Sequence, residues 1–214
     1  MKLYTYFRSS AAYRVRIALN LKGIAYEAVP VHLLRGGGEQ LQAAYRAINP
    51  AALVPALDDD GALLTQSLAM IEYLDETQAG MPLLPADAAG RARVRALALT
   101  VAADTHPLGN LRVLKYITGP LGQGEDVKLA WQQHWLRTGM ASLEALLAAH
   151  ADTGRYCHGD QPTMADCCLV PQVFSAQRFG VDVAAYPTIA RIHEACAQLP
   201  AFQRAHPAQQ PDAE

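Results

Sequence analysis

Residues 3–23 read LYTYFRSSAAYRVRIALNLKG and contain the first strand and the first helix that the sequence predicts. The opening five of these residues include three aromatic side chains and are bounded by polar residues, which is typical of a β-strand. Two serines, Ser9 and Ser10, then precede residues 11–22, whose apolar side chains recur at helical spacing. Gly23 follows where such a helix would end. The chain therefore begins with a strand that leads through a serine pair into a helix.

The same alternation continues through the first third of the chain. The stretch DDDG at residues 58–61 has the composition of a hairpin turn between two strand patterns. The expected elements are a strand at 26–31, a short helical or irregular piece at 39–48, hairpin strands at 54–57 and 62–65, and a helix at 68–77 capped by Ser67. The order β-α-β-α-β-β-α predicts a mixed four-stranded sheet with helices, as in a thioredoxin-like α/β domain.

Strand signals stop after the breaker-rich stretch AGMPLLP at residues 79–85. The segments beyond it have helical periodicity, and TMAD at 163–166 has the spacing of a capping box at a helix start. We expect helices at 89–116, 125–151, 165–179 and 187–198, and a loose tail from His206 onward. The predicted organisation is a thioredoxin-like domain at residues 1–80, a linker at 81–88 and an all-helical domain at 89–214.

Composition and charge exclude several classes of protein. With 214 residues, of which 51% are hydrophobic, the chain is long enough to bury roughly 70% of its unfolded surface. Its 18 basic and 20 acidic side chains leave a net charge of −2, which argues against nucleic-acid binding. No apolar run approaches the roughly 20 residues of a membrane span, and we expect no secretory signal.

The cysteines and histidines show no metal-binding pattern. Cys157, Cys167, Cys168 and Cys196 include no C-x-x-C pair, and no histidine belongs to an H-E-x-x-H motif. Buried, reduced thiols are therefore expected, in a cytoplasmic protein that holds no metal.

Three features of the first domain could together hold a peptide-like ligand. The serine pair at 9–10 stands where a strand passes into a helix, whose positive end favours an anion such as a thiolate. Plain N-capping by serine is the alternative explanation. Val54-Pro55 marks the edge or start of a strand, where the backbone of Val54 could pair with a peptide. Gln66-Ser67 is a second helix start, suited to a carboxylate. The combination describes a site for glutathione.

Longer motifs along both domains carry a family resemblance. They are YFRSS at 6–10, RVRIAL at 14–19, NP at 49–50, VP at 54–55, QSLA at 66–69, IEYL at 71–74, NL at 110–111, VLK at 113–115, TMAD at 163–166, LVPQV at 169–173 and YPTI at 186–189. In order and spacing the chain resembles the zeta class of glutathione transferases, which contains maleylacetoacetate and maleylpyruvate isomerases. The resemblance extends over essentially the whole length.

The resemblance implies a glutathione transferase fold and a role for each matching position. Ser9, Ser10 and Arg14 would be the catalytic groups around the glutathione sulfur. The other glutathione-binding positions would be Gln40, Val54, Gln66, Ser67, His106 and Asn110, with the Val54-Pro55 bond in the cis form. Arg8 and Arg178 would lie near the carboxylates of the substrate.

Two positions depart from the family pattern. Ala11 stands where many members have a cysteine after the two serines, so the catalytic sulfur has to come from glutathione itself. Arg112 stands where relatives can carry a small polar residue, and an added cation there could bind a further carboxylate or oxyanion. On a regular helix Arg112 would lie about 200° around from Asn110, so either Pro107 and Gly109 distort that turn or Arg112 faces away from the site.

The resemblance further implies glutathione-dependent cis–trans isomerisation of a dicarboxylate by a homodimer. The alanine at position 11 and the added Arg112 favour maleylpyruvate, which would be converted to fumarylpyruvate. Maleylacetoacetate, which is longer by one methylene, is the alternative substrate. A single methylene changes the free energy by which an enzyme discriminates two substrates by only about 1–3 kcal/mol. A transferase that consumes glutathione by conjugation, and a non-catalytic binding module, are alternatives from other classes. The intact serine pair, Val54-Pro55 and Gln66-Ser67 argue against the binding module.

Overall fold

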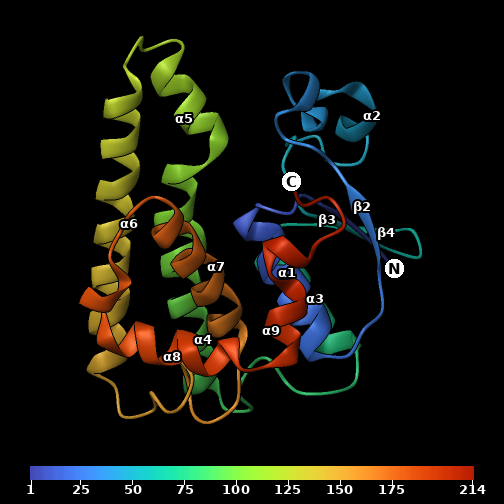
Figure 1. The fold of residues 1–214 in the computed structure, drawn as a ribbon. Helices are drawn as coiled ribbons and strands as arrows, with labels where there is room; N and C mark the ends of the chain where they lie inside the picture. The colour runs from blue at the N-terminus through green and yellow to red at the C-terminus, as the bar shows by residue number, and fades with distance from the viewer. The chain divides into compact units, whose positions relative to one another are not determined.

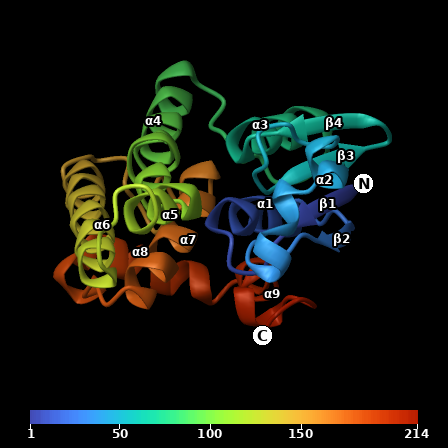
Figure 2. The same cartoon turned by 90° about the horizontal axis from the view of Figure 1, so that it is seen from above.

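In the computed structural model, which describes residues 1–214, strand β1 (Lys2–Thr5) is paired along both of its edges. β2 (Glu27–Pro30) runs parallel to β1, and β3 (Ala56–Asp59) runs antiparallel on the other side. β4 (Ala62–Thr65) pairs with β3, which gives the strand order β2-β1-β3-β4. The predicted mixed sheet of four strands is confirmed. Figure 1 shows it within the fold, and Figure 2 labels each of its strands.

β3 and β4 are joined by a tight hairpin turn. Asp60 and Gly61 have φ angles of 49° and 95°, and a type I′ turn requires positive φ at both central positions. The carboxylate of Asp58 accepts a hydrogen bond from the Gly61 N–H at 2.8 Å. Because the turn itself needs only two residues, β3 extends further into the DDDG stretch than the sequence analysis expected.

Helices α1 (Ser10–Leu21) and α3 (Ser67–Thr77) share one apolar core with the central strands. Its fully buried members are Leu3 of β1, Val15 and Leu19 of α1, Leu57 of β3, and Met70 and Leu74 of α3. Burial of each such side chain contributes about 1.5–3 kcal/mol to folding. This core therefore fixes the place of the first helical turn of both α1 and α3.

The end of the chain also packs on α1. α9 (Pro200–Ala205), which the sequence analysis did not predict, lies beside α1 in both views (Figures 1 and 2). Asn20 Nδ2 donates to the carbonyl of Ala201 at 2.9 Å. The chain divides into a first unit of Met1–Leu84 with Ala197–Glu214, and a second unit of Pro85–Cys196. The segment 197–214, assigned above to the helical domain, thus belongs to the first unit.

The expectation of a loose tail from His206 is wrong. A 3-10 turn at Pro207–Gln209 leads to Gln210, which is buried. Its Nε2 donates to the carbonyls of Arg204 and His206 at 2.9 and 3.0 Å. Polar composition indicated a solvated segment, but these side chains find fixed partners on their own unit.

The second unit contains helices and no strands. Its main helices are α4 (Ala88–Leu99), α5 (Leu111–Thr118), α6 (Glu125–Ala148), α7 (Met164–Arg178) and α8 (Pro187–Ala197). The shorter elements of the chain are α2 (Ala43–Arg46) and 3-10 turns at Arg35–Gly37, Glu39–Leu41 and Val183–Ala185. None of the helices combines the length and the apolar character that a membrane span requires.

The helix expected over residues 89–116 is interrupted, and the interruption includes the turn at Pro107 and Gly109 where a distortion was expected. After α4 come a π-helical turn at Thr100–Thr105 and a 3-10 turn at His106–Gly109, before α5 begins. Pro107 has no N–H to donate to the helical ladder. Thr105 also packs closely on α6, where a Cβ added at Gly139 would collide with the threonine side chain. The missing N–H of Pro107 and the packing of Thr105 against Gly139 therefore accompany two shorter helices in place of one long helix.

α7 begins with the capping box that the sequence predicted. Asp166 is fully buried, and its carboxylate accepts hydrogen bonds from the Thr163 N–H at 2.7 Å and the Thr163 hydroxyl at 2.9 Å. Its second oxygen accepts from the Cys157 N–H at 2.9 Å. One carboxylate therefore ties the start of α7 to the loop before it.

Replacing Asp166 by alanine should lower the free energy of unfolding by about 3 kcal/mol, because three donors lose their acceptor inside the protein. Urea denaturation followed by circular dichroism measures the loss. Asp182→Ala is the matched control, since that carboxylate is exposed and accepts from one N–H, of Ala184; its loss should be about 1 kcal/mol or less. Equal losses for the two variants would contradict the account.

Candidate functional site

The junction between β1 and α1 carries the predicted serine pair. Ser9 is the N-cap of α1, and its Oγ accepts a hydrogen bond from the Ala12 N–H at 3.2 Å. The Ser9 N–H donates to the carbonyl of Tyr6 at 2.9 Å, which closes the turn. Ser10 is the first helical residue and is partly exposed. Ser9 thus performs the capping role, and Ser10 presents a hydroxyl beside the first N–H groups of the helix, where an anion is favoured.

Arg14 links the start of α1 to the start of α3. The residue is 2% exposed, and its Nη1 donates to Ser67 Oγ at 3.2 Å. Ser67 is the first residue of α3 rather than its cap, which corrects the sequence expectation. The cap is Gln66, whose φ of 68° lies in the left-handed region that side chains other than glycine rarely adopt. Three predicted site residues are therefore brought together.

The loop before β3 is held by two side chains that meet at one carbonyl. Tyr45 Oη and Asn49 Nδ2 both donate to the Leu53 carbonyl at 2.7 Å. Burial raises the pKa of Tyr45, so that its hydroxyl stays protonated and remains a donor. The next peptide bond, Val54-Pro55, is cis, as expected, and Val54 is buried. The backbone of Val54 is thus presented by a rigid loop.

Gln40 has the most unusual environment of the predicted residues. It lies in the 3-10 turn Glu39–Leu41, is 7% exposed, and its buried Oε1 has no hydrogen-bond partner in the protein. Gly38 makes room for this side chain, since a Cβ at that position would lie 2.7 Å from Gln40 Nε2. A buried acceptor without a donor costs about 1–3 kcal/mol, so the Gln40 Oε1 has a hydrogen bond still to accept.

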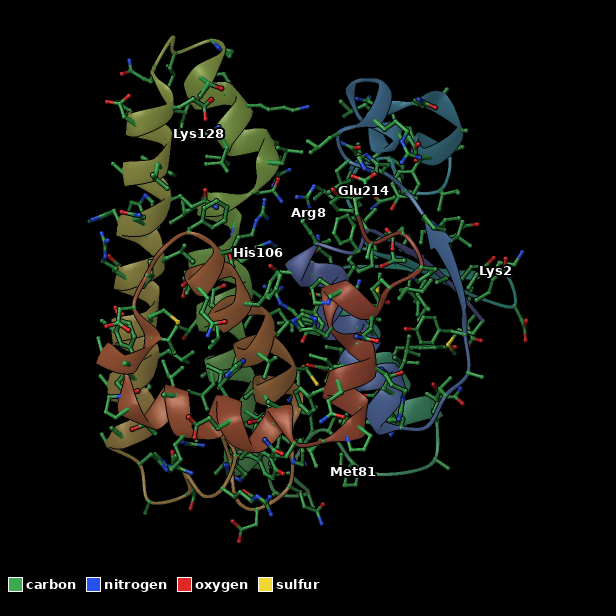
Figure 3. The ribbon with its side chains drawn as sticks, viewed as in Figure 1. Lys2, Arg8, Met81, His106, Lys128 and Glu214 are labelled. Atoms are coloured by element: carbon green, nitrogen blue, oxygen red, sulfur yellow. The ribbon has the colours of Figure 1, made fainter.

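Arg8 extends from the loop between β1 and α1 (Figure 3). Its Nη2 donates to the Tyr6 hydroxyl at 2.9 Å, and its guanidinium carbon lies 4.8 Å from the centre of the Phe7 ring. Tyr6 is buried, so the phenol orients the arginine from inside the first unit.

The remaining predicted residues belong to the second unit. His106 directly follows the π-helical turn and begins the next turn (Figure 3). Asn110 is the N-cap of α5, with its Oδ1 accepting from the Arg112 N–H at 3.1 Å, and the Arg112 side chain is exposed. Arg178 ends α7 with its guanidinium carbon 5.0 Å from the centre of the Phe179 ring.

Sequence reasoning missed two residues that hold the β1–α1 junction. Arg16 is fully buried and donates through Nη2 to the Phe7 carbonyl at 2.9 Å, while Asp212 Oδ2 accepts from the Phe7 N–H at 2.9 Å. Burial lowers the pKa of Arg16 to about 10, and the Asp212 carboxylate is among the groups that oppose this shift. Arg16 lay inside a recognised motif without an assigned role, and no sequence signal distinguished Asp212.

All four cysteines are free and buried. Burial raises the pKa of Cys157 and of Cys167 well above that of an ordinary thiol, and raises the pKa of Cys196 as well. Thiols that are buried and protonated are poor nucleophiles. Their environment is that of structural residues.

Two family models match the chain, one in each domain. The model of the glutathione S-transferase N-terminal domain matches residues 3–82, and that of the glutathione S-transferase C-terminal domain matches residues 130–208. The chain belongs to the glutathione S-transferase family. Its fold is the glutathione transferase fold, with a thioredoxin-like sheet domain and a helical domain.

Individual relatives place the chain within that family. It is 52% identical to a maleylpyruvate isomerase of Ralstonia, over 99% of both chains. It is 53% identical to a maleylacetoacetate isomerase of Rhizobium meliloti, over 96% of this chain and 95% of the relative. A holo structure of a bacterial zeta-class maleylpyruvate isomerase matches with a TM-score of 0.96 and 51% identity over 100% of both chains. The zeta-class resemblance is confirmed.

Proposed function

We propose that this glutathione transferase isomerises maleylpyruvate to fumarylpyruvate with glutathione as its cofactor. The observation that carries the proposal is the end-to-end match to the holo maleylpyruvate isomerase, at a TM-score of 0.96 and 51% identity. The site residues of the first unit supply the physical reasons.

The first unit has groups that suit a tripeptide with a thiol, two carboxylates and amide donors. The unpartnered Oε1 of Gln40 would accept from a ligand N–H. The starts of α1 and α3, at Ser10 and Ser67, offer backbone N–H groups to negative charge. The backbone of Val54, held by the loop before β3, would bind the peptide part of glutathione. Gln66 is proposed as a further glutathione-binding residue. The residues fit glutathione.

Stabilisation of negative charge is the task of the β1–α1 junction. Free thiols titrate near pH 8.5, so a thiolate is scarce at neutral pH unless its surroundings favour it. The Ser10 hydroxyl, the N-terminal turn capped by Ser9 and the positive charge of Arg14 would favour it together. Glutathione, when bound, supplies the sulfur that adds reversibly to the activated cis double bond, so that this bond can rotate and the cofactor is regenerated.

The arginines are assigned to the substrate, a dicarboxylate. Arg8 and Arg178 would bind the terminal carboxylates through charge-assisted hydrogen bonds, and Arg112 is a further candidate for the same task. The same guanidinium groups would stabilise the negative charge that develops on the ketone oxygen. His106 and Asn110 would complete the glutathione side from the helical unit. Tyr6 and Phe7 hold the Arg8 guanidinium in one orientation, which favours bidentate binding.

Two other activities have specific support among the relatives. Maleylacetoacetate isomerisation is favoured by the 53% identity to the enzyme of Rhizobium meliloti. Glutathione conjugation is favoured by a 46% identical zeta-class glutathione S-transferase of Euphorbia esula. An isomerase regenerates glutathione whereas a conjugating enzyme consumes it, so thiol content separates these classes.

We also infer a homodimer located in the cytoplasm. Closed twofold symmetry is the commonest assembly of soluble proteins, and four free cysteines suit a reducing compartment. In the proposed domain organisation, residues 1–80 provide the glutathione side, 81–88 the linker and the helices between residues 89 and 196 the substrate side.

The decisive measurement is the ultraviolet absorbance of maleylpyruvate with enzyme, with and without catalytic glutathione, beside a parallel run on maleylacetoacetate. We expect turnover that requires glutathione, a constant thiol concentration, and the larger kcat/KM for maleylpyruvate. Loss of thiol in step with substrate would establish conjugation, and a larger kcat/KM for maleylacetoacetate would establish the second isomerase.

Arg8→Ala and Arg178→Ala should each raise the KM for maleylpyruvate about 10- to 100-fold, because each removes a charge-assisted hydrogen bond. Glutathione affinity, measured by calorimetry, should change little. Arg155→Ala is the matched control, since that exposed arginine also lies on a neighbouring aromatic ring, Tyr156. Unchanged KM values in both site variants would remove these arginines from the substrate site.

Gln40→Leu should weaken glutathione binding about tenfold while the glutathione-free protein becomes no less stable. The substitution removes a ligand contact worth about 1.4 kcal/mol and also a buried acceptor that lacks a donor. Calorimetric titration and urea denaturation measure the two effects. Gln42→Leu, at an exposed position in the same loop, should alter neither. Wild-type affinity in Gln40→Leu would contradict the assignment.

A further inference from the structure

The peptide groups of Phe7 are clamped from two directions. The Phe7 N–H donates to Asp212 Oδ2 at 2.9 Å, and the Phe7 carbonyl accepts from Arg16 Nη2 at 2.9 Å. The preceding carbonyl, of Tyr6, accepts both from Arg16 Nη1 at 3.3 Å and from the Ser9 N–H at 2.9 Å. The backbone that leads into the serine pair is therefore held by one cation and one carboxylate.

Both of these side chains depend on the last ten residues of the chain. Arg16 Nε donates to the carbonyl of Ala205, the last residue of α9, at 3.1 Å. Asp212 is fixed by the segment on either side of it. Before it, Gln210 donates hydrogen bonds to the carbonyls described above. After it, Glu214 (labelled in Figure 3) forms an ion pair with Arg35 at 3.0 Å, and its Oε1 lies 3.2 Å from His32 Nε2.

The burial of Arg16 explains why a carboxylate, that of Asp212, is favourable beside the Phe7 peptide. A fully buried guanidinium is costly unless its donors are paired and a negative charge is near. Arg16 uses Thr5 Oγ1, at 3.1 Å, and backbone carbonyls as acceptors, none of which carries a charge. The Asp212 carboxylate is among the groups whose negative charge opposes the lowering of the Arg16 pKa by burial. Its Oδ2 also accepts the hydrogen bond from the Phe7 N–H.

We propose that Asp212 is a positioning residue for the thiolate site, acting through the Phe7 peptide on Ser9 and the start of α1. The inference rests on the proposed function. Donors that stabilise charge act strongly only when they are held in place beforehand. A displacement of about 1 Å at a reacting group can lower a rate by about 100-fold, and loss of the Phe7 anchor frees the junction for such a displacement.

The test compares Asp212→Ala, Asp212→Asn and the wild-type full-length protein. Asp182→Ala is again the matched control, because it removes the same kind of carboxylate-to-N–H bond from a loop of the helical unit. Hydrogen exchange of the segment that contains Phe7 is measured without glutathione. Ultraviolet thiolate absorbance of bound glutathione, its calorimetric Kd, kcat and the thermal midpoint are then measured with the same preparations.

In Asp212→Ala we expect faster exchange at Phe7, less bound thiolate, and a kcat lower by about 10- to 100-fold. The glutathione Kd should stay within about threefold, since the hydrogen bond of Asp212 is to Phe7 and not to Gln40, Val54, Gln66 or Ser67. Asp212→Asn keeps the shape of the side chain and an acceptor oxygen without charge, so its values should fall between those of the alanine variant and the wild type. That variant remains measurable if Asp212→Ala fails to fold.

Two outcomes would overturn the inference, and they are distinguishable. A lowered thermal midpoint with wild-type thiolate absorbance and kcat in the Asp212 variants would reduce Asp212 to a structural role. Absence of bound thiolate in the wild-type protein itself would overturn the proposed function, and this inference with it.

Discussion

A guanidinium group buried at the centre of the first unit imposes the constraint on which the rest of that unit depends. Arg16 has to satisfy its donors away from water, and it does so with Thr5 Oγ1 and the carbonyls of Tyr6, Phe7 and Ala205. A buried charge without such partners would cost several kcal/mol. The end of β1, the first helix and the last helix of the chain therefore assemble around one side chain, and the carboxyl-terminal segment becomes part of the unit that the amino terminus begins.

The same helix serves a second arginine. Arg14 and Arg16 lie two positions apart, which is a rotation of about 200° around the axis of a regular helix, so their side chains point to opposite sides. Arg16 secures the backbone before the serine pair, whereas Arg14 bonds to Ser67 at the start of α3. Two helix starts that favour negative charge are thus held in place by one rigid helix, whose own position is set by apolar burial of Val15 and Leu19. The packing of α1 on the core therefore also sets the position of the candidate site.

The helical unit positions its candidate residues by a different device. A π-helical turn follows α4 and ends just before His106, and Thr105 at its end lies close to Gly139 of α6. Asn110 then caps α5 with its own side chain. Irregular turns of this kind are frequent at functional positions, because they direct a side chain that a continuous helix would send elsewhere.

Local chemistry in the sequence determined the four strands, the capping box at Thr163 and Asp166, the hairpin turn and, through its motifs, the family. Each of these depends on residues that are close together in the chain. Local pattern did not find α9, the break after Leu99, the capping role of Gln66 or the bond from Asp212 to Phe7. The last of these joins residues 205 positions apart. A bond of that kind leaves no periodic trace, because its donor and acceptor meet only after burial of the core has brought both ends of the chain to the same helix.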